Sequence, residues 1–301
     1  MSLSRLGGMD PGRIGVFAGP INAMPAAVQR EFAAEMERLG YGTLWYGESL
    51  GQEAFARGAI YLAATQRLVI ASGIANIWAR DAAAMANGGR TLCEAWPGRF
   101  ILGLGVSHAP AVELRGHEYQ RPYSAMVDYL EAMAKAPWRG PDADIPPIVL
   151  AALGPRMVAL AGERTAGAYP YFSTSEHVRE VRAILGHEPF IASDLPVVVA
   201  PDLASARAVA DRHLNGYLGA ANYRNNLLRL GWSEVDLTPP GSDRLFEAVV
   251  AWGDLARIAA RLDERLEAGA DQVVFNLLDA DTSAPPVDLL RRRAPLVRSS
   301  R

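Results

Sequence analysis

Cysteine, long apolar runs and clusters of basic residues are scarce in this sequence of 301 residues. Cys93 is the only cysteine, which excludes an internal disulfide and any metal site built from several cysteines. No apolar run approaches the ~18 residues of a membrane-spanning helix, and no charged start followed by an apolar segment marks a secretion signal. These absences predict a soluble, cytoplasmic protein that does not contact a membrane.

Charge gives no sign of a nucleic-acid partner either. The formal net charge is −3, and no stripe of arginines interleaved with aromatic residues is present. The basic segment RRRAPLVRSSR at 291–301 is interpreted as a last helix and a tail. Since no two histidines stand four residues apart and no acidic residues cluster with ligand spacing, we expect no metal site.

What the sequence does contain is a repeated alternation of buried strands and helices. In its clearest copy, Leu68–Ile74 is apolar throughout, as expected of a strand that is buried on both faces of a parallel sheet. A segment with helical spacing follows at 81–95, and Arg99–Leu104 is a second apolar run. Polar groups gather just after it, in Val-Ser-His at 106–108. Because ligands bind at the carboxyl ends of parallel strands, this edge is the predicted site.

Further copies of this unit extend along the chain. Strands are expected at Arg13–Ala18, Thr43–Tyr46, Leu68–Ile74, Arg99–Leu104, Ile148–Leu153, Ala166–Tyr171, Val197–Ala200 and Gln272–Leu277. Eight strand–helix alternations predict an α/β protein of one domain, a (β/α)8 TIM barrel with tails at 1–12 and 298–301. Helical segments without intervening strands predict an insertion region at 201–252, between strands seven and eight. An open, doubly wound sheet is the alternative.

Several motifs follow one another in a characteristic order along this pattern. They are GYGTLW at 40–45 with Glu48, GIANIWAR at 73–80, GRFILGLGVSH at 98–108 and AALGP at 151–155. In this order they resemble the luciferase-like monooxygenase superfamily, and within it the branch of oxidoreductases that depend on the deazaflavin coenzyme F420. The segments at 222–227 and 252–254 are similar to an actinobacterial subgroup of that branch.

The resemblance implies a luciferase-like barrel that holds a flavin-type ring at the carboxyl ends of its strands. It also implies a non-proline cis peptide in a bulge on the third strand, at or beside Gly73–Ile74. Family members are commonly dimers, so a homodimer is expected.

Two catalytic residues, His108 and Glu48, are implied by position in the family. His108 stands where some members carry an acidic catalytic residue, and its ordinary pKa near neutrality suits acid–base work. The alternative is a hydrogen bond to cofactor or substrate without proton transfer. Glu48 could contact the ring or act as an acid, or it could cap the next helix together with Ser49. Because a serine hydroxyl is too weak an acid to replace the histidine that the family often has at position 49, sugar-phosphate oxidation is not expected.

Residues of the other motifs are candidates for cofactor binding. Asn76 could bond a pyrimidine-type edge or form a turn, and Arg80 could neutralise a carboxylate or pair with Asp81. The Ser-Thr-Ser run at 173–175 could hold a phosphate at a helix start, with help from His177, or simply cap that helix. The candidate cofactor contacts are Glu48, Gly73, Ile74, Asn76, Ser107, Leu153, Gly154, Ser173 and Thr174.

The resemblance predicts an enzyme that transfers a hydride between C5 of F420 and a small organic substrate. An FMN-dependent monooxygenase is one alternative, because the two cofactors share the shape of the ring. A non-catalytic protein that binds or carries F420 is the other. The motifs at 222–227 and 252–254 favour the deazaflavin, and no motif identifies the substrate.

Overall fold

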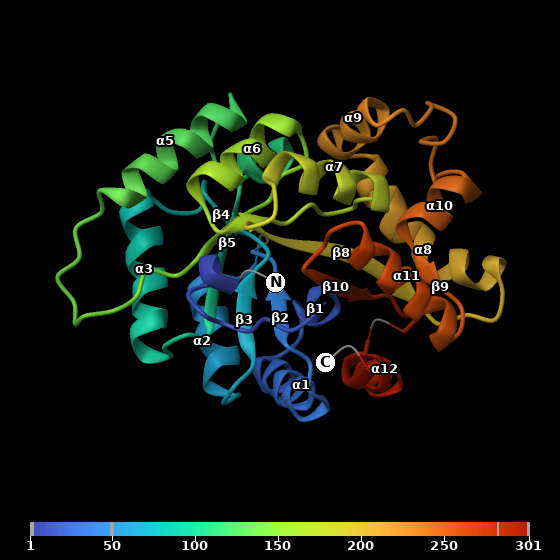
Figure 1. Ribbon diagram of the computed structural model, residues 1–301, viewed down its shortest axis with the longest axis horizontal. Helices are drawn as coiled ribbons and strands as arrows, with labels where there is room; N and C mark the ends of the chain where they lie inside the picture. The colour runs from blue at the N-terminus through green and yellow to red at the C-terminus, as the bar shows by residue number, and fades with distance from the viewer. Residues whose placement is uncertain (1–2, 49–50, 282, 300–301) are drawn as a thin grey trace.

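A computed structural model describes residues 3–48, 51–281 and 283–299, and its helices surround a barrel of parallel strands (Figure 1). Within these residues eight strands form the barrel, in the order β1 (Ile14–Phe17), β2 (Thr43–Tyr46), β3 (Val69–Ser72), β5 (Phe100–Gly105), β6 (Ile148–Leu150), β7 (Gly167–Ala168), β8 (Phe190–Val198) and β10 (Gln272–Leu277). β10 pairs with both β1 and β8, so the sheet closes on itself. The predicted (β/α)8 barrel is confirmed, and the open sheet is wrong.

Two further short strands extend the sheet outside the closed circuit. β4 (Ala75–Asn76) resumes the pairing with β5 that β3 begins, after a break at Gly73–Ile74. β9 (Ala251–Trp252) pairs with the end of β8. Both lie at the carboxyl end of the barrel, so they shape its mouth.

Helices follow the strands and cover the outside of the barrel (Figure 1). They are α1 (Ala26–Leu39), α2 (Ala54–Ala63), α3 (Ala82–Ala95), α4 (Ala109–Glu113), α5 (Pro122–Ala134), α6 (Pro155–Arg164), α7 (Ser175–Leu185), α8 (Leu203–Leu218), α9 (Ala221–Arg229), α10 (Asp243–Val249), α11 (Leu255–Glu267) and α12 (Val287–Ser299), with short 3-10 helices η1 (Leu3–Leu6) and η2 (Gly19–Ile21). Many start at a side chain that accepts a hydrogen bond from a first-turn N–H group. These caps are Glu53, Asp81, Thr174, Asp202, Ser242 and Asp254.

The helical insertion between the seventh and eighth barrel strands is confirmed. α8, α9, α10 and β9 separate β8 from α11 and β10, and they gather on the right of the barrel in Figure 1. They bury a hydrophobic cluster of their own, which includes Leu214, Tyr223 and Phe246. Phe172 and Val198 belong to the same cluster, so the insertion packs directly on the end of the barrel.

The seventh barrel strand starts earlier than the sequence indicates. The apolar pattern predicts Val197–Ala200, whereas β8 begins at Phe190 and ends at Val198. Ser193 and Asp194 interrupt the apolar run, yet both are fully buried, so the polar residues hide the strand from pattern analysis. The sixth strand is shorter than the predicted Ala166–Tyr171, since only β7 is paired.

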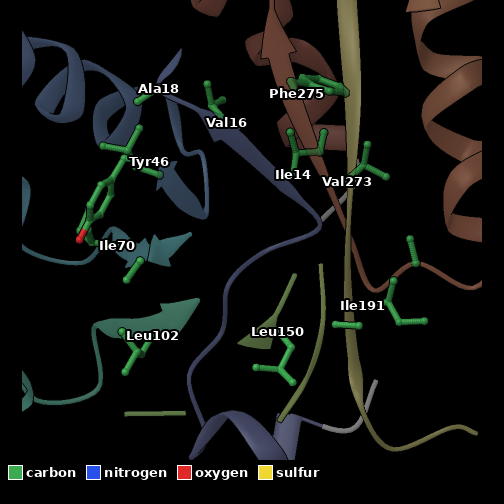
Figure 2. Packing of buried hydrophobic residues seen from close by; sticks show 14 of the residues in the cluster. Ile14, Val16, Ala18, Tyr46, Ile70, Leu102, Leu150, Ile191, Val273 and Phe275 are labelled. Carbon is green, nitrogen blue, oxygen red and sulfur yellow. The ribbon is translucent and has the colours of Figure 1, made fainter. Parts of the chain in front are cut away.

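Alternate residues of each strand face opposite sides, as in any strand. One set packs between the barrel and its helices, and Figure 2 shows part of this layer, including Ile14, Ile70, Leu102 and Phe275. The other set fills the barrel interior. This inner cluster contains Trp45, Val69, Ala71, Ile101, Val149, Tyr169, Phe190, Ala192 and Val274.

The segment before β1 closes the amino end of the barrel. Leu6 and Met9 belong to the inner cluster, and the side chain of Leu6 is fully buried. Arg5 donates to the carbonyl oxygens of Gly162 and Thr165 at 2.6 and 3.2 Å. The expected tail at 1–12 therefore packs against the barrel from residue 5 onward. Within the described ranges, no helix is long and apolar enough to cross a membrane.

Candidate functional site

At the carboxyl end of the barrel, the inward-facing residues that end or follow β2, β3, β5 and β6 are small. Gly47 follows β2, Gly73 follows β3, Gly105 ends β5 and Ala151 follows β6. These positions adjoin one another: a Cβ atom on Gly47 would lie 3.5 Å from the carbonyl oxygen of Gly73, and one on Gly105 would lie 3.3 Å from Cβ of Ala151. We call these four residues the floor of the mouth. Three glycines and one alanine lack any side chain larger than a methyl group, which lets a ligand approach the backbone closely.

The floor is shaped by the peptide between Gly73 and Ile74, which is cis. The resemblance implied a cis peptide at this place, and the structure has it there. The glycines of β5 make room for this segment. A Cβ atom on Gly103 would overlap the carbonyl oxygen of Ser72, and one on Gly105 would lie 2.6 Å from Cγ1 of Ile74. The Gly-Leu-Gly motif therefore serves close packing against the bulge.

Glu48 holds the bulge in place. Its side chain is 2% exposed and pairs with Arg80, with one bond at 3.1 Å and a second, shorter one. The carboxylate also accepts from the backbone N–H groups of Asn76 at 2.8 Å and Ala54 at 3.3 Å. Its own N–H donates to the carbonyl oxygen of Ile74 at 3.0 Å. Both carboxylate oxygens are thus engaged, and this geometry favours a positioning role over proton transfer.

The residue that caps the next helix is Glu53, not Glu48. Glu53 begins α2 and accepts from the N–H group of Ala56 at 2.7 Å. Arg80 also donates to Glu53 at 2.8 Å, so it neutralises two carboxylates of the β2–α2 region and does not pair with Asp81. Ser49 lies outside the described residues.

Asn76 uses its side-chain oxygen in a turn. Oδ1 accepts from the N–H group of Trp78 at 3.0 Å, so the turn alternative describes this end of the amide. Asn76 is 2% exposed, and contact of its side-chain NH2 group with a cofactor stays a prediction. Trp78 in turn donates from Nε1 to the carbonyl oxygen of Val106 at 3.0 Å. The segment after the bulge is thereby tied to the end of β5.

His108 lies where β5 leads into α4, beneath the insertion. Ser107 has a left-handed φ of 58°, and this bend places His108 at the start of α4 without a capping bond. Its ring lies 5.5 Å from that of Tyr223, measured between centroids. Burial lowers the pKa of His108, and a hydrogen bond with Asn222 opposes that shift. The imidazole is therefore neutral at pH 7 and is able to accept a proton.

The hydroxyl groups of Ser173 and Thr174, before and at the start of α7, contact other groups of the protein. Thr174 is fully buried and accepts from the N–H group of His177 at 3.3 Å. Ser173 is 2% exposed and lies 3.3 Å from the carbonyl oxygen of Pro170 and 3.4 Å from Oγ of Ser193. This geometry favours the capping alternative. Phosphate binding by Ser173 and Thr174 stays a prediction.

His177 positions the turn between β6 and α6. Its Nε2 lies 2.9 Å from the carbonyl oxygen of Leu153, which leads into Gly154. Nδ1 lies 3.5 Å from the amide nitrogen of Asn226 in α9. Nε2 therefore carries the proton and Nδ1 accepts. Because burial lowers the pKa of His177, this ring is neutral and adds no positive charge for an anion.

An aromatic wall adjoins the floor, and sequence analysis missed it. Phe17 connects the two, because its ring lies 5.7 Å from that of Tyr171 and a Cβ atom on Gly47 would lie 3.4 Å from its Cζ. Tyr171 and Phe172 follow β7, while Tyr217 comes from α8 and Tyr223 from α9. The ring of Tyr217 lies 5.2, 5.1 and 5.0 Å from the rings of Tyr171, Phe172 and Tyr223. The hints in the sequence were the Tyr-Pro-Tyr-Phe run at 169–172 and the segment at 222–227, which contains Tyr223. No local pattern could show that two distant helices supply the other rings.

The wall carries hydroxyl groups on its inner side. Tyr217 donates to the hydroxyl of Tyr171 at 3.0 Å, and the amide of Asn276 donates to the same oxygen at 2.7 Å. Asn276 is the penultimate residue of β10 and is 4% exposed. The mouth thus combines the small residues of the floor with the tyrosines of the wall, and His108 lies against Tyr223 of that wall. Among the described residues, no cluster of metal-ligating side chains is found.

Comparison with known proteins places this geometry in context. The family model described as luciferase-like monooxygenase matches residues 4–272. A protein of Mycobacterium tuberculosis (strain ATCC 25618 / H37Rv), provisionally named a coenzyme F420-dependent oxidoreductase, is 26% identical over 273 residues. That match covers 74% of this chain and 79% of the mycobacterial protein.

Solved structures share the fold at low sequence identity. The coenzyme F420-dependent tetrahydromethanopterin reductase of Methanopyrus kandleri has a TM-score of 0.74 at 16% identity, over 94% of this chain and 99% of its own. An F420-dependent secondary alcohol dehydrogenase in complex with an F420-acetone adduct has a TM-score of 0.73 at 17% identity, over 96% and 99%. The oxygenating constituent of 3,6-diketocamphane monooxygenase of Pseudomonas putida, in complex with FMN, has a TM-score of 0.72 at 15% identity, over 96% and 97%.

Proposed function

Because the chain belongs to the luciferase-like monooxygenase family of enzymes, we propose that it is an F420-dependent oxidoreductase. It would transfer a hydride between C5 of the deazaflavin and a small organic substrate. The observation that carries this proposal is the floor of Gly47, Gly73, Gly105 and Ala151, which carries no side chain larger than a methyl group and adjoins the wall of tyrosines through Phe17. The sequence match to the mycobacterial protein supports F420 as the cofactor.

The residues at the mouth suit a planar, polar-edged ring. The floor offers backbone for one face of the ring, and the NH2 group of Asn76 and the backbone at Leu153 and Gly154 offer polar contacts at its edge. His177 fixes that backbone through the carbonyl oxygen of Leu153. The deazaflavin supplies the hydride chemistry when bound, and the protein supplies orientation and a dry environment.

His108 is the proposed acid–base residue. Oxidation of an alcohol removes a hydride from carbon and a proton from oxygen, and the neutral imidazole is able to accept that proton. In the reverse direction the imidazolium returns it to the carbonyl oxygen. Asn222 forms a hydrogen bond with the imidazole of His108, and the ring of Tyr223 lies 5.5 Å from it.

A second candidate is an FMN-dependent monooxygenase, which the fold of the diketocamphane enzyme in complex with FMN supports. A non-catalytic F420 carrier is the third. Within the proposed function, a homodimer stays a prediction from the family resemblance, and a cytoplasmic location stays a prediction from the sequence.

Fluorescence titration of the purified protein with F420 and, separately, with FMN tests the proposal. We expect F420 to bind at micromolar concentration or below and FMN to bind much more weakly. Binding of F420 would then justify a screen of alcohols, aldehydes and enones in both redox directions. The opposite preference would favour the monooxygenase, and F420 binding without turnover would favour the carrier.

A substitution in the floor tests whether F420 binds at this site. Gly47→Val adds a branched side chain to the floor and should weaken F420 binding at least tenfold. Gly216→Ala is the matched control, since a Cβ atom on this helical glycine meets nothing within 4 Å. Equal affinities of the two variants would count against a ring on this floor.

A further inference from the structure

A fully buried carboxyl group lies below the floor and the wall. Asp194 of β8 has no exposed surface. Within the described part of the chain, neither carboxylate oxygen makes a hydrogen bond of good geometry, although the N–H groups of Phe172 and Ser173 face it. Burying a polar group without hydrogen-bond partners lowers the free energy of unfolding, so Asp194 is a candidate for a functional role.

The strand register places Asp194 inside the barrel. Ala192, two residues earlier, belongs to the inner cluster, and strand residues two apart share a face. Asp194 stands opposite Val274 of β10, another member of that cluster. The next inward residue of β10 is Asn276, which bonds the hydroxyl of Tyr171. Asp194 therefore lies one layer of inward-facing residues below the bonded hydroxyl groups of Tyr171 and Tyr217.

The surroundings of Asp194 shift its pKa in opposite directions. Burial raises its pKa to about 7, against the pull of Arg265 and of the N–H groups of Phe172 and Ser173. Arg265 comes from α11, is fully buried, and bonds the carbonyl oxygen of Ala248 at 3.2 Å. Among the described residues, its Nε and Nη1 have no partner. The carboxyl group can therefore change its charge without breaking an ion pair.

The titratable groups on the other side are tyrosines. The charge of Asp194 contributes to the raised pKa values of Tyr169, Tyr171, Tyr217 and Tyr223, after the larger effect of burial. Asp194 is thus electrically coupled to the wall of the mouth. The hydroxyl of Tyr169 is buried and has no hydrogen-bond partner in the described ranges.

We propose that Asp194 is a proton-exchanging positioning residue: where its carboxyl group is ionised, it takes up a proton from solvent when an anionic ring occupies the mouth and releases it when the ring leaves. A second negative charge in a water-poor interior raises the free energy of the carboxylate, so protonation relieves the repulsion. The ligand class is an anionic, planar cofactor. The inference rests on the proposed function, because the probe is F420.

Calorimetric titration with F420 at pH 7, in two buffers with different heats of ionisation, measures the coupling. At a pH near the pKa, about half of the carboxyl groups are ionised, so wild type should take up about half a proton per F420 bound. Asp194→Asn keeps the shape and should reduce the uptake to near zero. Asp263→Asn removes an exposed carboxyl from α11 and should leave the uptake unchanged. F420 binding with equal uptake in all three proteins would overturn the inference.

A second measurement needs neither cofactor nor variant. In wild-type protein with 13C-labelled aspartate carboxyl groups, one resonance should titrate near pH 7, well above the ordinary range of aspartate. Absence of such a resonance overturns the inference even if F420 binds. If F420 fails to bind while the resonance is present, the proposed function fails and the coupling of Asp194 to the ring fails with it, whereas F420 binding with unchanged uptake overturns the coupling alone.

Discussion

His108 illustrates how much the surroundings of one residue decide. The sequence offers a histidine after a strand, and the structure adds that its ring is partly buried beneath Asn222 and Tyr223. Burial disfavours the charged imidazole, so His108 is a base at neutral pH. Glu48 shows the opposite case, because its carboxylate is fully engaged by Arg80 and by backbone N–H groups.

The protonation state of His108 leads to a prediction for catalysis. In alcohol oxidation, kcat/KM should rise as the pH rises through the pKa of His108, which lies below 6.5, and should be flat above pH 7. His108→Gln should lower kcat by about 10²- to 10⁴-fold, the usual contribution of a general base. Steady-state rates with F420 in excess between pH 5 and 8 measure both effects.

His187→Gln, at an exposed histidine, is the matched control and should change neither the rate nor the pH profile. If His108→Gln retained the acidic limb of the profile, another group would be the base, and His108 would serve only as a hydrogen-bonding residue.

At the scale of elements, α9 connects the insertion to the barrel through one face. Asn222, Asn226 and Arg229 are spaced by four and three residues, which places them on the same side of the helix. They meet His108, His177 and Glu180, the last through two bonds of 2.6 and 2.9 Å. α9 therefore links the end of β5 with α7 across the mouth.

These contacts differ in their expected contribution to stability. His177→Phe leaves the carbonyl oxygen of Leu153 without its donor and should lower the free energy of unfolding by about 1–3 kcal/mol. Arg229→Gln breaks an ion pair whose side chains are 34% and 30% exposed, and the loss should stay below about 1 kcal/mol. Urea denaturation measures both losses.

Hydrogen exchange adds a local readout for the same two variants. The amides at the start of α6 should exchange faster in His177→Phe than in Arg229→Gln. Equal losses of stability and unchanged exchange at α6 would contradict the positioning role of His177.

Elements also show what the sequence could predict. Apolar runs with clear ends, such as those of β5 and β10, are located correctly because burial on both faces leaves an unbroken hydrophobic signal. β8 is misplaced because Ser193, Asp194 and Pro196 break that signal inside a buried strand. Of the floor, the family resemblance named Gly73 as a cofactor contact, and Gly105 and Ala151 lie in the motifs that carry that resemblance. The wall could not be predicted, because Tyr217 and Tyr223 meet Tyr171 only after the insertion has packed onto the barrel.

On the scale of the whole molecule, buried groups of opposite kinds shape the dependence of stability on pH. Burial lowers the pKa of His213 to about 4, whereas it raises that of Asp194 to about 7. The unfolded chain binds a proton to histidine more tightly than the folded one does, so His213 stabilises above pH 6.5 and loses that contribution as the pH falls. For Asp194 the folded state binds the proton more tightly, so its contribution grows as the pH falls below 7.

The two contributions should nearly cancel between pH 7 and 5. With unfolded pKa values of about 6.5 and 3.8, each amounts to about 2 kcal/mol over this interval. Relative to wild type, Asp194→Asn should lose about 2 kcal/mol more on going from pH 7 to 5, because the histidine effect is no longer opposed. His213→Phe keeps an aromatic ring beside Tyr217 and should show the opposite deviation. Urea denaturation at both pH values measures these slopes, and parallel slopes in all three proteins would mean that neither group keeps its shifted pKa in the folded state.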